Sequence, residues 1–165
     1  MRSLIAVSAV VLLAAIPASA GITPGCKAWQ LTASFKEIPG SAGAGSISYA
    51  VRLRNHGGAC RISGRPGLVL LGKHGRPLPT QTVPDHPGTG TAALITIGKN
   101  HVARADARFS PDIPGPDEGN PCEPTAYTIR VMLLSPASGT VRGPIHPPTA
   151  VCEHGRLVLG LLHRG

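Results

Sequence analysis

The four cysteines are the side chains of this 165-residue sequence whose chemistry is most tightly constrained. No two of them stand at the C-x-x-C spacing that builds half of a zinc site. Zinc ligation is the rival interpretation, but an even count without that spacing favours two disulfides in a chain that leaves the cytoplasm. The predicted disulfide-forming residues are Cys26, Cys60, Cys122 and Cys152.

Histidines and carboxylates are the groups that could carry acid–base or metal chemistry. The sequence holds seven histidines, and no two have the i, i+2 or i, i+4 spacing of a metal pair on one element. Its eight carboxylates give no reason to pair any two across a glycosidase cleft. Asp112, Asp117 and Glu118 share one loop, but their spacing matches no calcium loop. We therefore predict no metal site.

Recognisable catalytic and phosphate-binding motifs are absent from the sequence. There is no G-x-S-x-G nucleophile elbow and no H-E-x-x-H zinc motif. The glycine-rich stretch at 40–45 lacks the Gly-Lys-Ser/Thr ending of a phosphate loop, which indicates a flexible connection. We predict no catalytic residue, no cofactor and no enzymatic activity. A Ser-His-Asp triad assembles in space rather than in sequence, so a hydrolase without a local motif stays open.

The first twenty residues have the order of a secretory signal peptide. Arg2 precedes an apolar stretch at 4–16, and small residues at 18–20 form a cleavage site. The apolar run is about 13 residues long, shorter than the roughly 20 that a spanning helix needs. We predict cleavage after Ala20, a secreted or cell-wall-associated chain and no membrane span afterwards. An uncleaved anchor and a lipoprotein acylated at Cys26 are the alternatives.

Charge and aromatic content limit the partners of the mature chain. The sequence has a net charge of +8, and removal of Arg2 with the leader leaves +7. The basic residues are scattered, which favours a solvated surface, while the balance still permits attraction to an anionic wall polymer. Few aromatic residues are present and the core needs them, so we expect no nucleic-acid surface that stacks bases on exposed rings.

Proline and glycine divide the chain into short segments with alternating apolar residues. The clearest segment is 46–54, where Tyr49, Val51 and Leu53 share one face with Ile47. The pattern predicts an all-β fold of seven or eight strands and a single domain over 21–165. The other predicted strands are 27–35, 68–71 as a central strand, 76–83 as an edge strand, 94–97, 101–109, 127–133 and 156–162.

The inward faces of these strands define the predicted core. In the strand at 127–133, Tyr127 is expected to face inward together with Ile129. Two irregular connections, 84–91 and 110–121, are expected to supply any binding surface, because a rigid sandwich presents its loops. The predicted core residues are Trp29, Leu31, Tyr49, Val51, Leu53, Ile129, Val131 and Leu159.

Several segments, taken in order, resemble a known family. Cys26 opens the first strand, Asn55-His56-Gly57 ends the second, and Cys60 leads into Gly64-Arg65-Pro66-Gly67; a Cys-Glu-Pro at 122–124 and a final Cys152 follow. This order resembles the actinobacterial exported family called domain of unknown function 4232, over nearly the whole mature chain. The resemblance implies an immunoglobulin-like antiparallel β-sandwich with two disulfides, and it implies no known activity. The chain departs from the family at Ile97, where members often have proline.

Strand direction predicts which cysteines pair. Four cysteines allow three connectivities. If successive strands run up, down and up, then Cys26 and Cys60, which open the first and third, lie at one end. The segments 127–133, 139–145 and 156–162 are also expected to alternate in direction. Cys122 and Cys152 precede the first and the third of them, so these two cysteines also lie at one end. We therefore predict the pairs Cys26–Cys60 and Cys122–Cys152, which the family resemblance also suggests.

These observations predict an exported, non-catalytic domain that acts as an extracellular or cell-envelope interaction module. The alternative is a secreted hydrolase, or an inhibitor of one, without a recognisable motif. The partner stays open between an envelope or extracellular protein and an anionic wall polymer.

Overall fold

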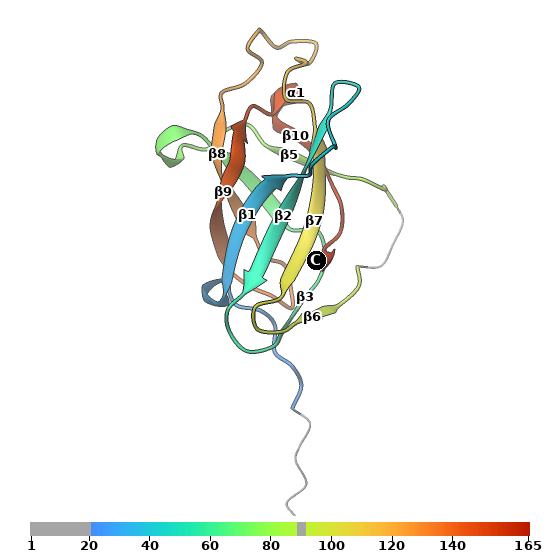
Figure 1. Cartoon of the computed structure of the whole chain (residues 1–165), viewed down its shortest axis with the longest axis vertical. Coiled ribbons are helices and arrows are strands. Elements are labelled where there is room, and N and C mark those ends of the chain that lie inside the picture. The colour runs from blue at the N-terminus through green and yellow to red at the C-terminus, as the bar shows by residue number, and fades with distance from the viewer. Residues whose placement is uncertain (1–20, 89–91) are drawn as a thin grey trace, which may run out of the picture.

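A computed structural model describes residues 21–88 and 92–165 of the chain (Figure 1). The predicted signal peptide lies outside the described residues. Within them, no helix is long and apolar enough to cross a membrane. The strands are β1 (Leu31–Glu37), β2 (Ile47–Asn55), β3 (Cys60–Ile62), β4 (Gly67–Leu71), β5 (Gln81–Pro84), β6 (Ile95–Ile97), β7 (Val102–Phe109), β8 (Ala126–Met132), β9 (Thr140–Thr149), β10 (Arg156–Leu159) and β11 (His163–Arg164). The helical turns are η1 (Ala28–Gln30), η2 (Lys73–Gly75) and α1 (Cys152–Gly155).

The strands form one large sheet and one small one, which confirms the all-β fold. The large sheet has the order β4-β8-β9-β1-β2-β7-β10-β5, with β11 paired to β7, while β3 and β6 pair separately. The expected purely antiparallel arrangement is wrong, because β1 runs parallel to β9 and β10 runs parallel to β5. The strand count exceeds seven or eight because β3, β9 and β11 fall outside the eight predicted strands, although 139–145 was expected to return between two of them.

The two ends of the sheet order test the predicted edge and central strands. β5, within the proline-rich segment, is a terminal strand as expected. The strand β4 is the other terminal strand, so its expected central place is wrong. Its continuous apolar run is buried because the returning chain covers it: the Leu78 N–H donates to the Leu70 carbonyl at 2.9 Å, and Leu71 bridges Pro77.

The core lies between the inward faces of the strands. Phe35, Tyr49 and Phe109 come from β1, β2 and β7 and pack with ring centroids 5.0 to 6.1 Å apart. The alanines of β7 alternate with polar residues and are fully buried, as the period-two pattern predicts. Every predicted core residue except Trp29 is buried.

Two aromatic side chains depart from the predicted core face. Trp29 is 81% exposed because η1 precedes β1 and breaks the strand period. That turn forms because the Gln30 side-chain oxygen accepts the Lys27 N–H at 2.9 Å, and the Gln30 N–H donates to the Lys27 carbonyl. Tyr127 is 45% exposed, since the β8–β9 register shifts between Ala126 and Thr128.

The backbones of β9 and β1 lie close together where the two strands pair. Phe35 pairs with Ile145 and Lys36 with His146 in a parallel register. A Cβ atom on Gly143 would lie 1.9 Å from the Ala33 carbonyl oxygen, so only glycine fits there. This β9–β1 seam makes β9, β1, β2 and β7 neighbours in one sheet, and Figure 1 shows them side by side.

The two disulfides join the predicted pairs. Cys26 and Cys60 have Cα atoms 4.8 Å apart, and Cys122 and Cys152 have Cα atoms 5.3 Å apart. β3, which begins at Cys60, lies at the opposite end of the molecule from α1, which begins at Cys152 (Figure 1). Each disulfide therefore lies at its own end of the molecule, as the predicted up-and-down strand order requires.

Candidate functional site

The outward face of β9, β1 and β2 is strongly basic. Alternate residues of a strand share a face, so the buried residues of each strand identify which ones point outward. No carboxylate occupies an outward position on these three strands. The outward residues are Thr32, Ser34 and Lys36 on β1, Ser48, Ala50, Arg52 and Arg54 on β2, and Arg142, Pro144 and His146 on β9. We call this surface the basic face.

Cross-strand register brings cations of the basic face next to one another. Arg52 lies directly opposite Arg104 of β7, and like charges in that position destabilise a sheet. Arg104 is neutralised by Asp106, whose carboxylate accepts two of its N–H groups at 2.6 and 3.0 Å. These hydrogen bonds, with the charge of Asp106, raise the pKa of Arg104 despite its partial burial. Arg52 and Arg54 form no ion pair with any residue of the described chain.

A hollow of about 540 Å³ lies over the basic face. It crosses three strands and extends to Val102 of β7. Its polar lining combines guanidinium, ammonium and imidazole groups with two hydroxyls, all of which can donate hydrogen bonds to an anion. The polar lining residues are Thr32, Ser34, Lys36, Arg52, Arg54 and His146.

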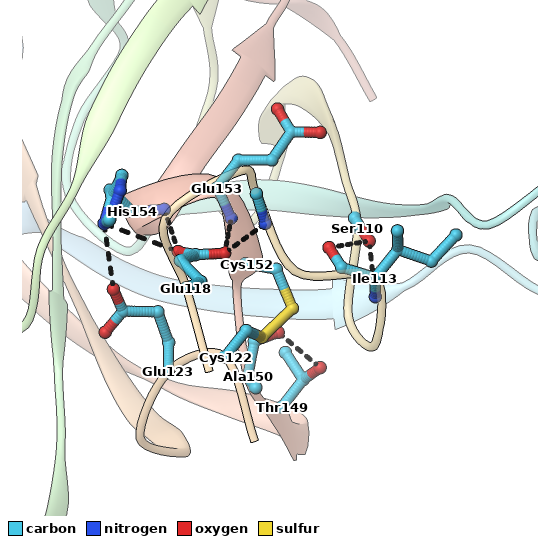
Figure 2. The surroundings of a disulfide bond; sticks show 11 residues. Ser110, Ile113, Glu118, Cys122, Glu123, Thr149, Ala150, Cys152, Glu153 and His154 are labelled. Atoms are coloured by element: carbon cyan, nitrogen blue, oxygen red, sulfur yellow. Dashed lines mark hydrogen bonds and ion pairs between the residues drawn. A yellow bond between two sulfur atoms is a disulfide. The ribbon is translucent and has the colours of Figure 1, made fainter. Parts of the chain in front are cut away.

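A second polar region surrounds the Cys122–Cys152 disulfide (Figure 2). The carboxylate of Glu118 is buried, with 2% of its side chain exposed. It accepts the backbone N–H groups of Gly115 at 2.6 Å and Glu153 at 2.7 Å, and that of His154 as well. The same carboxylate therefore holds its own loop and the α1 turn together, and we call this arrangement the Glu118 latch.

The α1 turn suits this role because its backbone is left-handed. Glu153, His154 and Gly155 have φ angles of 55°, 56° and 76°, so consecutive N–H groups converge in the kind of concavity that binds anions. A Cβ on Gly155 would lie 1.9 Å from the Pro79 carbonyl oxygen, so glycine is required there. Burial alone would raise the pKa of Glu118, but the three backbone donors and nearby His154 outweigh it and hold the pKa below its ordinary value.

Two groups of described residues have the geometry to hold a metal ion, and both include Glu118. In one, the partners are Cys122 and Cys152, whose sulfur atoms are bonded to each other and offer no thiolate. In the other, His154 Nδ1 lies 3.5 Å from Glu118 and 3.7 Å from Glu123. Because three backbone N–H groups already occupy the Glu118 carboxylate, the arrangement acts as a structural latch.

The structure assigns other roles to the loops and acidic residues that were predicted to bind a partner or a metal ion. The loop 110–121, an expected binding surface, is tied down by the Glu118 latch; residues 89–91 of the other expected loop lie outside the described chain. Of the three acidic residues considered for calcium, only Glu118 enters a cluster in the described structure. The basic face was missed because its cations are far apart in sequence. Its signal was the pair of arginines at alternate positions near the end of β2, Arg52 and Arg54.

The fold and these two regions define a disulfide-bonded all-β domain with a basic sheet face. The chain belongs to the family described as Domain of unknown function (DUF4232), whose model matches residues 26–161. This confirms the family resemblance, and the match includes both disulfides. No curated protein and no solved structure matches the chain.

Proposed function

We propose that the chain is an exported, non-catalytic interaction module that binds an anionic ligand on its basic face. The observation that carries the proposal is the hollow over β9, β1 and β2, lined by cations and hydroxyls without a compensating carboxylate. Clustered cations of this kind raise the local concentration of anions and accelerate their association.

The electrostatic repulsion between arginines on the basic face supports a role for them in binding. Arg52 faces Arg104 across the sheet, and a neutral residue at position 52 would remove that repulsion without exposing any core surface. Arg104 has a partner in Asp106, whereas Arg52 and Arg54 have none among the described residues. A bound anion would supply the missing partner.

Non-catalytic action is supported by what the titratable groups contact. The Glu118 carboxylate, the most buried of those that form ion pairs, already accepts three backbone hydrogen bonds that join its loop to the α1 turn. Export is supported by the leader pattern at 1–20 and by two disulfides, which persist in oxidising compartments.

Binding of polyanions at graded salt concentrations tests the ligand-binding surface. Arg52→Gln with Arg54→Gln should weaken binding to polyphosphate at least tenfold, while Arg76→Gln with Lys73→Gln removes the same charge at exposed positions outside the hollow and should weaken it far less. If both double variants lost the same affinity for polyphosphate, net charge alone would explain the binding, and the proposed surface would be refuted.

Export and catalysis need their own measurements. Intact mass of the secreted protein should show a chain beginning at Gly21; recovery of Met1, or of a lipid adduct on Cys26, would contradict cleavage after Ala20. Screening against peptide, ester, glycoside and phosphate substrates should give no turnover. Turnover that tracks the purified protein and disappears on mutation of one of its own residues would overturn the non-catalytic proposal.

A further inference from the structure

A second cluster of unpaired cations lies beyond the hollow. Arg130 of β8 and Arg142 of β9 are direct cross-strand partners, so two arginines occupy neighbouring positions on the outward face. Neither forms an ion pair with any described residue, and the Arg130 Nε is buried without a hydrogen-bond partner. Like-charged partners destabilise a sheet here as they do at Arg52.

The two cationic clusters belong to one continuous surface. Arg142, Pro144 and His146 alternate along β9 and share its outward face. Pro144 and His146 also line the hollow, and His146 pairs with Lys36 across the seam. The outward faces of β8, β9, β1 and β2 are therefore adjacent, and three inter-strand steps separate Arg130 from Arg54, which is about 14 Å.

We propose that the ligand is a linear polymer with repeated phosphate groups, laid across the strands so that it occupies two subsites. The inference rests on the proposed function and adds the ligand's chemistry and direction. The near subsite is the hollow at Lys36, Arg52 and Arg54; the far subsite is the Arg130–Arg142 pair. A ligand with a single anionic group reaches one subsite, whereas a chain longer than about 14 Å reaches both.

Phosphate fits the far subsite better than carboxylate does. A guanidinium donates two parallel N–H groups to a pair of anionic oxygens. The oxygens of a phosphate group are arranged tetrahedrally and can face two guanidinium groups at once, whereas the two oxygens of a carboxylate lie in one plane. Arginine rather than lysine supplies both far cations and two of the three near ones.

Binding of two inorganic probes of different length tests this inference. Long-chain polyphosphate spans both subsites, and tripolyphosphate fills one. Arg142→Gln, at an exposed outward position, should weaken long-chain binding at least fivefold and lower its salt dependence by about 0.7 in log K per log salt. Tripolyphosphate binding in the hollow should stay unchanged. Arg76→Gln is the matched control, and thermal unfolding verifies that each variant is folded.

The possible failures are distinguishable. If Arg142→Gln binds long-chain polyphosphate as tightly as Arg76→Gln does, the far subsite is refuted while the hollow stands. If poly-glutamate of equal charge binds as tightly as polyphosphate, the phosphate assignment is refuted. If single-stranded DNA binds more tightly than polyphosphate of equal charge, base recognition is present and the assignment is again refuted. If the Arg52→Gln, Arg54→Gln pair binds both phosphate probes as tightly as the parent, the proposed function itself fails.

Discussion

The two disulfides close loops of almost equal length but lie in different surroundings. The sequence separations are 34 for Cys26–Cys60 and 30 for Cys122–Cys152, so chain entropy assigns each about 3.7 kcal/mol. Around Cys26, backbone hydrogen bonds join the same segments: its N–H donates to the Arg61 carbonyl and its carbonyl accepts the Ser138 N–H, both at 2.9 Å. Around Cys122 and Cys152, the Cys152 N–H donates to the Ser110 carbonyl at 2.9 Å, and the side-chain carboxylate of Glu118 makes the remaining connection.

A disulfide contributes to the free energy of unfolding in two ways: it cross-links the unfolded chain, and it packs within the folded one. Both bridges restrict the unfolded chain equally, so any difference in their measured effect comes from the folded surroundings. Cys26, Cys60 and Cys152 are fully buried, whereas Cys122 is half-buried and belongs to an irregular loop. We therefore expect the Cys26–Cys60 end to be the more cooperative part of the fold.

The largest effect should come from removing the core disulfide. Cys26→Ala with Cys60→Ala should lower the free energy of unfolding by about 5 kcal/mol, because lost core packing adds to lost cross-linking. The denaturant midpoint measured without reductant checks this value. An effect no larger than that of removing the Cys122–Cys152 bridge would contradict the comparison.

Asn55 should be the most sensitive polar residue at the same end. Its buried amide donates to the carbonyls of Gly58 and Ile97 at 2.8 and 3.0 Å and accepts the Gly57 N–H at 2.9 Å. Asn55→Ala should cost about 3 kcal/mol because these buried groups lose their partner. Gln81→Ala, which truncates an exposed amide, is the control. Equal denaturant midpoints for the two variants would refute the role of Asn55.

Removing the second disulfide should have a smaller and more local effect than removing the core one. Cys122→Ala with Cys152→Ala should cost about 3.7 kcal/mol, the cross-linking effect alone, since the Glu118 latch still holds the loop in the folded state. Hydrogen exchange should accelerate at the amides of Glu153 and His154 before the sheet is affected. Simultaneous loss of protection in β1 and β2 would contradict a local role.

The smallest effect should depend on pH. The folded-state pKa of Glu118 lies below the ordinary value of 4.5, so its stabilising effect is complete above that pH and is lost as the pH falls through the folded pKa. Glu118→Gln should therefore destabilise the protein at pH 7, and the difference from the parent should shrink at acidic pH. Asp117→Asn removes a charge from the same loop and is the control. A difference that does not change with pH would refute the latch.

Much of the strand pattern followed from the sequence because one face of each long strand is buried. The alternation in β2 and β7 identified inward residues such as Val51 and Ala105 correctly. Trp29 could not be placed in this way, because a single Gln30 side chain turns the backbone just before β1 begins. The parallel pairing of β9 with β1 could not be predicted from either segment alone, because Gly143 is required only by its contact with Ala33, which is distant in sequence.

The candidate surfaces were less predictable than the core. Outward cations such as Arg54 and Arg142 are ordinary surface residues in sequence and become neighbours only through strand order. The Glu118 latch depends on three backbone groups whose direction is set by left-handed residues at 153–155. No spacing rule connects a glutamate in a loop with a turn more than thirty residues later.

The β9–β1 seam also determines when the exposed edge of β1 can be covered during synthesis. β1 and β2 are consecutive and can form a hairpin early, but β1 receives its other neighbour only when Ile145 has been synthesised. Until then the hairpin has an unpaired edge, which is a template for association with another chain. A fragment ending at residue 139 should therefore aggregate at concentrations where the full chain is monomeric; a monomeric fragment in light scattering would refute this folding order.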